Sequence, residues 1–306
     1  PDLLAATENV FTSAVIASPE AGLSLPAAHA AADVILRAST VKPDGFANLR
    51  FAALAGVLPG SPFFPAAYAD RGTPAIAVAT EAAELAVDAL REVTSPAKAR
   101  RRLVSMIEAH GAAFERLLQP VLTQADIRFL GIDFSLAPYP EPVRSLGSAI
   151  EAFGPPAVGA FGSAAACAFL AHCLDQAKFR RTGFCGLFMP VLEDSILAAR
   201  AASGQLTVTD LLLYSTLCGT GLDVIPLPGD VSPDALAAVL IDVGAVSLRH
   251  AKQLTARLMP LPGKAAGDDV HFDFPYFADS RVLALPSVPL GGLLAGTGTL
   301  EIGPRP

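Results

Sequence analysis

The chain has 306 residues, of which 52% are hydrophobic and 17% are charged, and its formal net charge is −7. The length suits one large core, and the apolar composition excludes a disordered chain. The negative charge argues against a nucleic-acid surface, which needs clustered Lys and Arg. The one basic run, residues 98–102 (KARRR), lies in a helical pattern with acidic neighbours. We interpret it as a solvated helix face, with a phosphate or partner patch as the alternative.

The expected elements alternate along the chain between helical and extended patterns. Helices are expected at residues 26–38, 81–92, 95–122, 143–153, 162–178, 192–202, 207–217 and 233–251. Strands are expected at residues 48–57, 74–80, 127–134, 183–189, 222–225, 255–259 and 282–285. In the helix that begins at Ser95, Pro120 is expected to help end the helical run. The alternation predicts an α/β fold of parallel strands with covering helices, as an open sheet or a closed barrel.

The domain organisation is expected to be simple. No linker and no repeat of fixed period divides the sequence, so residues 1–306 are expected to form a single α/β domain. Residues 1–44 are the N-terminal part with the weaker pattern, and residues 286–306 form a tail rich in Gly and Pro. The chain begins at Pro1 without a Met, and we expect this to reflect processing or truncation.

Location is inferred from one apolar stretch and from the cysteines. Residues 153–174 carry no formal charge and approach the length that spans a bilayer. Their prolines, glycines and Ala-rich middle favour a buried helix of a globular core over a membrane span. The four cysteines have no zinc-site spacing, and no signal peptide is recognised. We therefore expect a cytoplasmic protein with free thiols and no membrane partner.

Three loops hold the candidate functional residues: residues 131–140 (GIDFSLAPYP), 183–194 (GFCGLFMPVLED) and 217–230 (LCGTGLDVIPLPGD). Each begins as an apolar, strand-like run and breaks into Gly, Pro, carboxylate, Ser or Cys before the next helical pattern. Rigid strands of α/β proteins aim such loops at a common crevice. The pattern therefore predicts one site built from all three loops.

The first two loops contribute carboxylates. Asp133 and Ser135 follow a predicted strand, and Asp133 is interpreted as a metal ligand, a base or a helix cap. Glu193 and Asp194 stand at a predicted helix start, where the helix dipole favours their ionised forms. For this pair, a purely structural cap is the alternative to a catalytic role.

The third loop carries the most chemistry. Cys218 lies in a Cys-Gly-Thr-Gly turn whose glycines let backbone amides approach the sulfur, which would favour a thiolate; a buried, inert Cys is the alternative. We predict four catalytic candidates: Cys218, Asp223, Glu193 and Asp194. We predict five ligand-binding candidates: Asp133, Ser135, Gly219, Gly221 and Asp230. The converging carboxylates suggest a divalent metal such as Mg²⁺. Among the histidines, His271 in the run GDDVHFD has carboxylate neighbours that suit a metal ligand.

Several runs of sequence resemble a family of uncharacterised bacterial and archaeal proteins, DUF711, also called UPF0210. They are residues 131–138 (GIDFSLAP), 186–194 (GLFMPVLED), 218–223 (CGTGLD), 225–230 (IPLPGD) and 257–267 (RLMPLPGKAAG), with residues 45–68 as a further stretch. The resemblance implies the α/β barrel of the pyruvate formate-lyase-like glycyl radical enzymes. It also implies that the barrel is incomplete at the N-terminus unless another chain supplies the missing part. Radical chemistry is not implied, because residues 291–303 lack the glycyl radical pattern.

Two functions remain open from the sequence. The first is an enzyme that acts on a small molecule at a carboxylate- and Cys-lined site at the strand ends. The alternative is a non-catalytic binding or regulatory protein, or a subunit of a larger assembly, on a degenerate barrel. No complete catalytic signature such as a Walker A loop, GxSxG or HExxH distinguishes them. A homodimer is expected in either case, because so apolar a chain has surface to bury.

Overall fold

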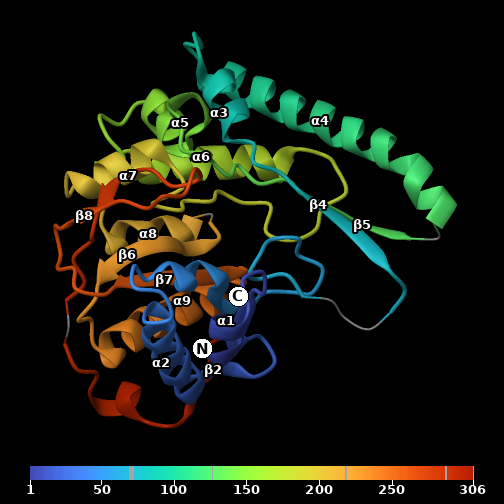
Figure 1. Cartoon of the computed structure of the whole chain (residues 1–306). Coiled ribbons are helices and arrows are strands. Elements are labelled where there is room, and N and C mark those ends of the chain that lie inside the picture. Colours follow the sequence, from blue (N-terminus) through green and yellow to red (C-terminus); the bar gives the residue numbers. More distant parts are fainter. Residues whose placement is uncertain (69–71, 126, 218, 287, 306) are drawn as a thin grey trace.

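The computed structural model describes residues 1–68, 72–125, 127–217, 219–286 and 288–305, and they form a mixed α/β fold (Figure 1). Within these ranges, the largest sheet has six strands in the order β10-β2-β1-β3-β7-β6. The strands are β1 (Thr12–Ser18), β2 (Gly22–Ser24), β3 (Phe51–Ala55), β6 (Gly221–Pro228), β7 (Leu254–Leu261) and β10 (Thr299–Leu300). Strand β1 runs parallel to β3, and β6 runs parallel to β7, whereas β3 and β7 are antiparallel. We call this the main sheet.

Two helices, α2 (Leu25–Ser39) and α9 (Pro233–His250), pack against each other and cover one face of the main sheet. Both begin with a Ser cap followed by a Pro in the first turn, which pre-organises the helix start. Alternate residues of β7 point to opposite faces. Leu254, Ala256 and Leu258 therefore join the core under these helices, while Thr255, Arg257 and Met259 face the other side, where the candidate site lies.

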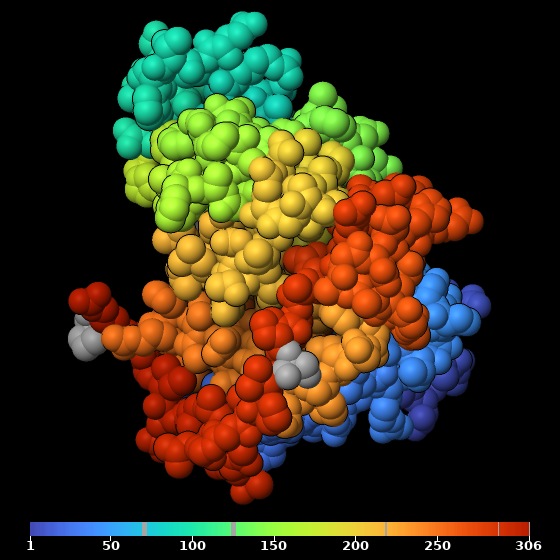
Figure 2. Space-filling view, turned by 90° about the vertical axis from the view of Figure 1, so that its left-hand side faces the viewer, coloured from blue at the N-terminus to red at the C-terminus, as the bar shows by residue number. Residues whose placement is uncertain are grey.

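A second sheet pairs β4 (Ala75–Ala79) with β5 (Arg128–Asp133) in parallel. On this side of the molecule lie α3 (Ala83–Leu90), α4 (Pro96–Ala125), α5 (Leu146–Phe153), α6 (Ser163–Gln176) and α7 (Ser195–Ala202), whereas α8 (Val208–Leu217) packs between α6 and β6 of the main sheet. Figure 1 shows the long α4 extending outward above the β4–β5 pair. Figure 2 shows the orange-to-red segment after β7 lying on the surface beside the yellow α7 region, where the Ser280 hydroxyl donates to the carbonyl of Ala198 at 2.9 Å.

Residues 180–193, which we call the bridging segment, connect the two sheets. Their isolated β-bridges, all parallel, pair Arg181 with Ile132, Leu187 with Leu136 and Pro190 with Asp223. The amide of Ile132 donates to the carbonyl of Arg180 at 2.7 Å, and the amide of Val191 donates to the carbonyl of Asp223 at 3.1 Å. The bridging segment thus lies between β5 on one side and β6 on the other.

The predicted α/β class with covering helices is confirmed, and the described residues form an open arrangement without a closed barrel. The predicted strand at residues 183–189 is wrong, because the glycines and the positive φ of Cys185 (46°) hold this stretch in an irregular path. The predicted helix end near Pro120 is also wrong. Helix α4 continues to Ala125, since a proline removes only one backbone donor and can be accommodated inside a long helix.

Two further sequence expectations differ from the structure. Residues 282–285 form no strand, and the neighbouring pairing is limited to β8 (Asp269–Val270) with β9 (Ser280–Arg281). The short strand expected at residues 222–225 is the middle of the eight-residue β6. The remaining short elements are α1 (Asp2–Ala6) and the 3-10 turns Phe46–Arg50, Pro142–Arg144 and Gly292–Ala295. No helix in the described part of the chain combines the length and apolar character needed to cross a bilayer.

Candidate functional site

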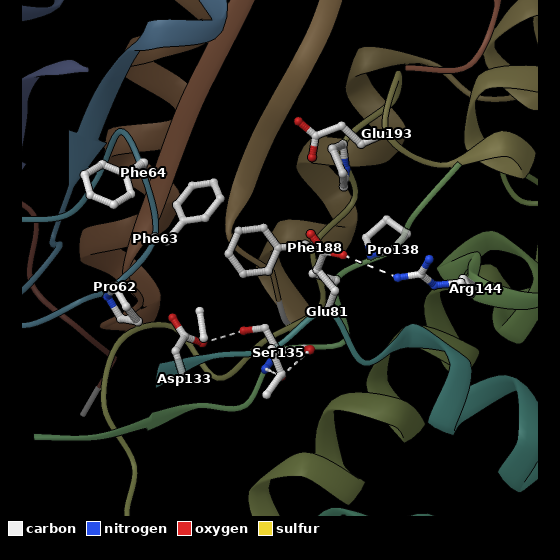
Figure 3. Close-up of a pocket in the computed structure, with 14 residues that line it drawn as sticks. Pro62, Phe63, Phe64, Glu81, Asp133, Ser135, Pro138, Arg144, Phe188 and Glu193 are labelled. Carbon is white, nitrogen blue, oxygen red and sulfur yellow. Dashed lines mark hydrogen bonds and ion pairs between the residues drawn. The ribbon is translucent and has the colours of Figure 1, made fainter. Parts of the chain in front are cut away.

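A cavity of about 450 Å³ lies where the bridging segment joins the β4–β5 sheet (Figure 3). Its walls come from four stretches that are distant in sequence: residues 62–64, 79–81, 133–144 and 188–193. Phenyl rings and prolines line one side, as Figure 3 shows for Pro62, Phe63 and Phe188. The polar side chains at the cavity come from Thr80, Glu81, Asp133, Ser135, Arg144 and Glu193.

Behind Glu193, a buried arginine connects the cavity to the main sheet. Arg257 on β7 donates from Nε to Asp223 Oδ1, and from Nη2 to Asp223 Oδ2 at 2.9 Å. The same Nη2 donates to Glu193 Oε1 at 3.2 Å. The guanidinium carbon also lies 5.2 Å from the ring centroid of Phe63, which is a cation–π distance. The Arg257 side chain is 5% exposed and that of Asp223 is 1% exposed, so this is a desolvated ion pair.

A β-bulge places Asp223 for this contact. The register between β6 and β7 shifts between Leu222 and Ile225, and Val224 has a φ of 40°. A β-branched residue in the left-handed region is strained, so the surrounding contacts must hold it there. Bulges reorient side chains relative to a regular strand. Here Asp223 pairs with Arg257 while Val224 is buried in an apolar cluster with Leu192 and Met259.

Glu193 is the titratable group that faces both the ion pair and the cavity. Burial raises its pKa to about 7, Arg257 opposes this rise, and the negative charges of Asp223 and Glu81 add to it. Because Arg257 is already paired with Asp223, it offsets only part of the effect of burial on the pKa of Glu193. The Glu193 side chain remains 26% exposed, so it can exchange a proton with a molecule in the cavity.

Asp133 and Ser135 organise the end of the cavity. Asp133 Oδ1 accepts from the Ser135 hydroxyl at 2.5 Å and from the Cys185 amide at 2.8 Å, and Oδ2 accepts from the Phe184 amide at 2.9 Å. Burial raises the pKa of Asp133, and these hydrogen bonds oppose the rise. A Cβ on Gly183 would stand 2.2 Å from Asp133 Oδ2, so glycine is needed there. The carboxylate thus fixes the turn of the bridging segment.

Asp194 points away from its neighbour Glu193 and into the protein. It is fully buried and caps α7, with Oδ1 accepting from the amides of Ile196 and Leu197 at 2.9 and 3.0 Å. It also accepts from the Ser145 hydroxyl at 2.6 Å and the Gly147 amide at 3.1 Å. Burial raises the pKa of Asp194, and these bonds oppose the rise. Of the two interpretations of this residue, the structure displays the cap that joins α5 to α7.

The other residues predicted from the third loop lie apart from the cavity. Gly219 lines a separate hollow of about 250 Å³ near Cys185 and Gln253. Gly221 begins β6, and its Cβ would stand 2.0 Å from the carbonyl oxygen of Thr255, so it serves close strand packing. Asp230 is exposed in the turn after β6. Cys218 lies outside the described residues.

Sequence reasoning missed the residues that complete the site. Arg257 was noted only as part of a resembling run, and Glu81, Arg144 and Phe63 were not considered as site residues. Arg144 lies 3.6 Å from Glu81 and 3.5 Å from Glu84. One signal could have identified Arg257: β6 and β7 each carry a single charged residue within eight. Buried charges are paired, so the two were candidates for each other.

A metal centre has less support. Across the described ranges, no group of three or more His, Cys, Asp and Glu side chains could hold an ion. His271 Nδ1 lies 2.7 Å from Asp279 Oδ1, but both side chains are at least 75% exposed. Burial raises the pKa of the Cys185 thiol to about 11, and its sulfur donates to two backbone carbonyls. This thiol therefore stays protonated at neutral pH.

Comparison with known proteins assigns the family. A family model described as "Uncharacterised ACR (DUF711)" matches residues 1–276. The chain belongs to this family. Among DUF711 relatives, a UPF0210 protein of Pyrobaculum arsenaticum is 33% identical over 275 residues, which cover 87% of this chain and 60% of that protein. A UPF0210 protein of Methanosarcina acetivorans is 31% identical over 289 residues, covering 89% and 61%.

The chain thus spans about three fifths of the length of these relatives. Their shared name, UPF0210 protein, assigns no substrate or reaction. The span that matches the DUF711 model contains every residue of the cavity and also Asp223 and Arg257. The family assignment therefore covers the whole candidate site.

Proposed function

We propose that this DUF711 protein is an enzyme that acts on a small molecule in the cavity, with Glu193 as the group that accepts or donates a proton. One observation carries the proposal. Glu193 borders the cavity with a partly exposed side chain and a pKa raised to about 7. A general acid or base works best when its pKa lies near the operating pH, because both protonation states are then populated. Perturbed carboxylates in clefts are candidates for this role.

The neighbouring residues position Glu193 for proton transfer. Arg257 holds Oε1 by a hydrogen bond of 3.2 Å, which leaves Oε2 as the oxygen that carries the exchangeable proton. Asp223 contacts Arg257 through both carboxylate oxygens and neutralises it. The arginine therefore orients Glu193 without forcing it to remain ionised. Asp223 and Arg257 are positioning residues in this mechanism, whereas Glu193 meets the ligand.

The apolar walls support the same role. Phe63 and Phe188 pack at 4.6 Å between ring centroids beside the polar end of the cavity. Rings in this position limit the number of waters near Glu193, and electrostatic interactions are stronger where water is excluded. The substrate would contribute its apolar part to this wall and its reacting atom to Glu193.

Carbon-13 NMR of side-chain carboxyls tests the proposal. A pH titration from 4 to 9, with Glu193→Gln identifying the resonance, is expected to give a midpoint near 7 for Glu193. Glu84, which is half exposed, serves as the internal reference. A Glu193 midpoint between 4 and 5 would refute the proton-transfer role.

A second candidate is a subunit of a larger assembly, or a binding protein, with a homodimer as its simplest form. Leu117 is 73% exposed and Val121 is 48% exposed, one turn apart on the outer half of α4. Exposed apolar side chains on one helix face favour a protein contact. Light scattering after size exclusion is expected to give twice the chain mass, and Leu117→Lys with Val121→Lys to give the monomer. Leu213→Lys, at another exposed position, is the control; a monomeric wild type refutes the dimer.

We also propose that the sheets are parts of a barrel of the pyruvate formate-lyase-like type. The parallel bridges from β5 through the bridging segment to β6 support it, because they continue one strand direction across both sheets. A crystal structure of a full-length relative should show further strands beside β4, and an open sheet there would refute closure. A cytoplasmic location is proposed as well, supported by the free thiols of Cys173 and Cys185. Cell fractionation checks it.

A further inference from the structure

We propose that the cavity binds a small organic amine, with its ammonium group between Glu193 and Glu81 and its apolar body against the phenyl wall. The proposal rests on the proposed function in that it uses the same cavity and the same glutamate. It adds the chemical class of the ligand.

The charged side chains around the cavity favour the binding of a cation. Arg257 is paired with Asp223 and also contacts Glu193. Arg144 likewise contacts two carboxylates, Glu81 at 3.6 Å and Glu84 at 3.5 Å. Two guanidinium groups therefore contact four carboxylates. When all of these groups are ionised, the cluster has a net charge of −2. A bound ammonium would remove part of this excess.

The position of the two outer glutamates suits one ligand group. Glu193 and Glu81 both line the cavity, and the charge of Glu81 contributes to the raised pKa of Glu193. Glu81 is 57% exposed, and its contact with Arg144 is a long one of 3.6 Å. An ammonium group has three donors, enough for both carboxylates. Figure 3 shows Glu193 and Glu81 on the same side of the cavity, with Phe63 and Phe188 beside them.

The remaining walls select an organic cation over a metal ion. Phe63, Phe64, Phe188 and neighbouring prolines line the cavity, and they offer no ligands to a hydrated ion. In the part of the chain that the structure describes, no metal-binding group of three or more side chains occurs. The volume of about 450 Å³ lies in the range of small-molecule pockets, roughly 300–1,000 Å³. The face of a phenyl ring attracts a cation, and the ring also packs against apolar groups.

Binding of the amine is linked to pH through Glu193. Its charged neighbours are Arg257 from β7, Asp223 from β6 and Glu81 from the residue stretch after β4. A proton on Glu193 and the ammonium group compete for the same carboxylate. Binding should therefore release a proton, and the affinity should rise about tenfold per pH unit below the Glu193 pKa and level off above it.

Isothermal titration calorimetry at pH 8 tests the ligand class with three probes of one shape: 2-phenylethylamine, 2-phenylethanol and phenylacetate. The amine is expected to bind at least tenfold more tightly than the alcohol, and the anion more weakly than either. Glu193→Gln and Glu81→Gln should each reduce the advantage of the amine about tenfold. Glu8→Gln, at an exposed position outside the cavity, should leave it unchanged.

The outcomes separate this proposal from the proposed function. Equal affinities for amine and alcohol, or no amine binding at all, overturn the ligand class even when NMR places the Glu193 midpoint near 7. Selective amine binding that depends on Glu81 and Glu193 supports the ligand class, whatever the midpoint of Glu193. If that midpoint lies between 4 and 5, only the proton-transfer role is refuted. Glu81 is exposed, so Glu81→Gln gives a decisive result even if Glu193→Gln folds poorly.

Discussion

Asp223 on β6 and Arg257 on β7 are the single charged residues of two adjacent, fully buried strands, and they pair through two hydrogen bonds. Their pairing determines what Glu193 can do. Arg257 would hold Glu193 ionised if Asp223 were absent, and Glu193 would lose its orientation if Arg257 were absent. The pair therefore sets both the geometry and the proton affinity at the cavity.

Breaking this pair should be costly for stability. Arg257→Met leaves the Asp223 carboxylate buried without a partner, and we expect the free energy of unfolding to fall by about 3–5 kcal/mol. The double variant Arg257→Met with Asp223→Leu should recover more than half of that loss, because no buried charge remains. Urea unfolding measures both. The exposed pair Arg91 and Asp88 is the control, where Arg91→Met should cost at most about 1 kcal/mol.

Glu193 should make stability depend on pH. Its folded pKa of about 7 lies above the ordinary 4.5, so the folded state binds the proton more tightly than the unfolded state. This contribution is complete below pH 4.5 and is lost as the pH rises through 7. At about 1.4 kcal/mol per pKa unit, it amounts to about 3–4 kcal/mol. Relative to wild type, Glu193→Gln should therefore gain stability between pH 5 and pH 8.

The measurement is urea unfolding of both proteins at several pH values. Taking the difference between them cancels the pH dependence of other buried carboxyls, Asp133 and Asp194 included. Leu213→Gln, at an exposed position without a titratable group, provides the control and should show a constant difference. A Glu193→Gln difference that does not change with pH would mean that the folded pKa of Glu193 is ordinary.

Asp194 should affect folding without affecting the ligand. Asp194→Ala removes a helix cap and the partner of the buried Ser145 hydroxyl, and we expect a loss of about 2–4 kcal/mol. Ser232→Ala, which removes the simpler cap of α9, should cost about 1 kcal/mol. Calorimetric amine affinity of Asp194→Ala, measured where it remains folded, should match wild type. A selective loss of affinity would instead place Asp194 in the site.

Gly183 tests the role of Asp133 in shaping the bridging segment. Gly183 and Gly263 have similar positive φ values, 65° and 75°, but a Cβ meets Asp133 only at Gly183. Gly263→Ala should cost about 1 kcal/mol, from backbone strain alone. Gly183→Ala should cost at least twice as much, because it also displaces the Asp133 carboxylate. Thermal unfolding compares the two, and equal losses would show that the contact with Asp133 is unimportant.

The sequence was sufficient for most helices because their signals are local. Ser95 and Pro96 mark the start of α4, and the spacing of apolar residues identifies α2 and α9. Strands β1 and β2 were not anticipated, since a short run such as residues 12–18 becomes a strand only when β3 lies beside it. Residues 183–189 of the bridging segment were predicted as a strand because the run is apolar. The turn there is held by Asp133, which is distant in sequence, so local composition does not indicate it.

The candidate site was predicted in part. Glu193, Asp133 and Ser135 do line the cavity, but nothing local distinguishes Glu193 from Asp194, whose side chains diverge because only one of them caps α7. Residues 59–65 contain three prolines, which indicate an irregular segment, but nothing in the sequence indicates that Phe63 and Phe64 reach the cavity wall. Such contributions depend on long-range contacts, which one sequence does not reveal.

The cavity walls come from the end of β4, the segment after β5 and the bridging segment. Among the described residues, the backbone bridges between the β4–β5 pair and the main sheet run through the bridging segment. A molecule that contacts both Glu81, next to β4, and Glu193, next to β6, links the two sheets. Amide hydrogen exchange along β4 and β5, whose ends line the cavity, should therefore slow when the cavity is filled, so occupancy can be measured as a gain in local rigidity.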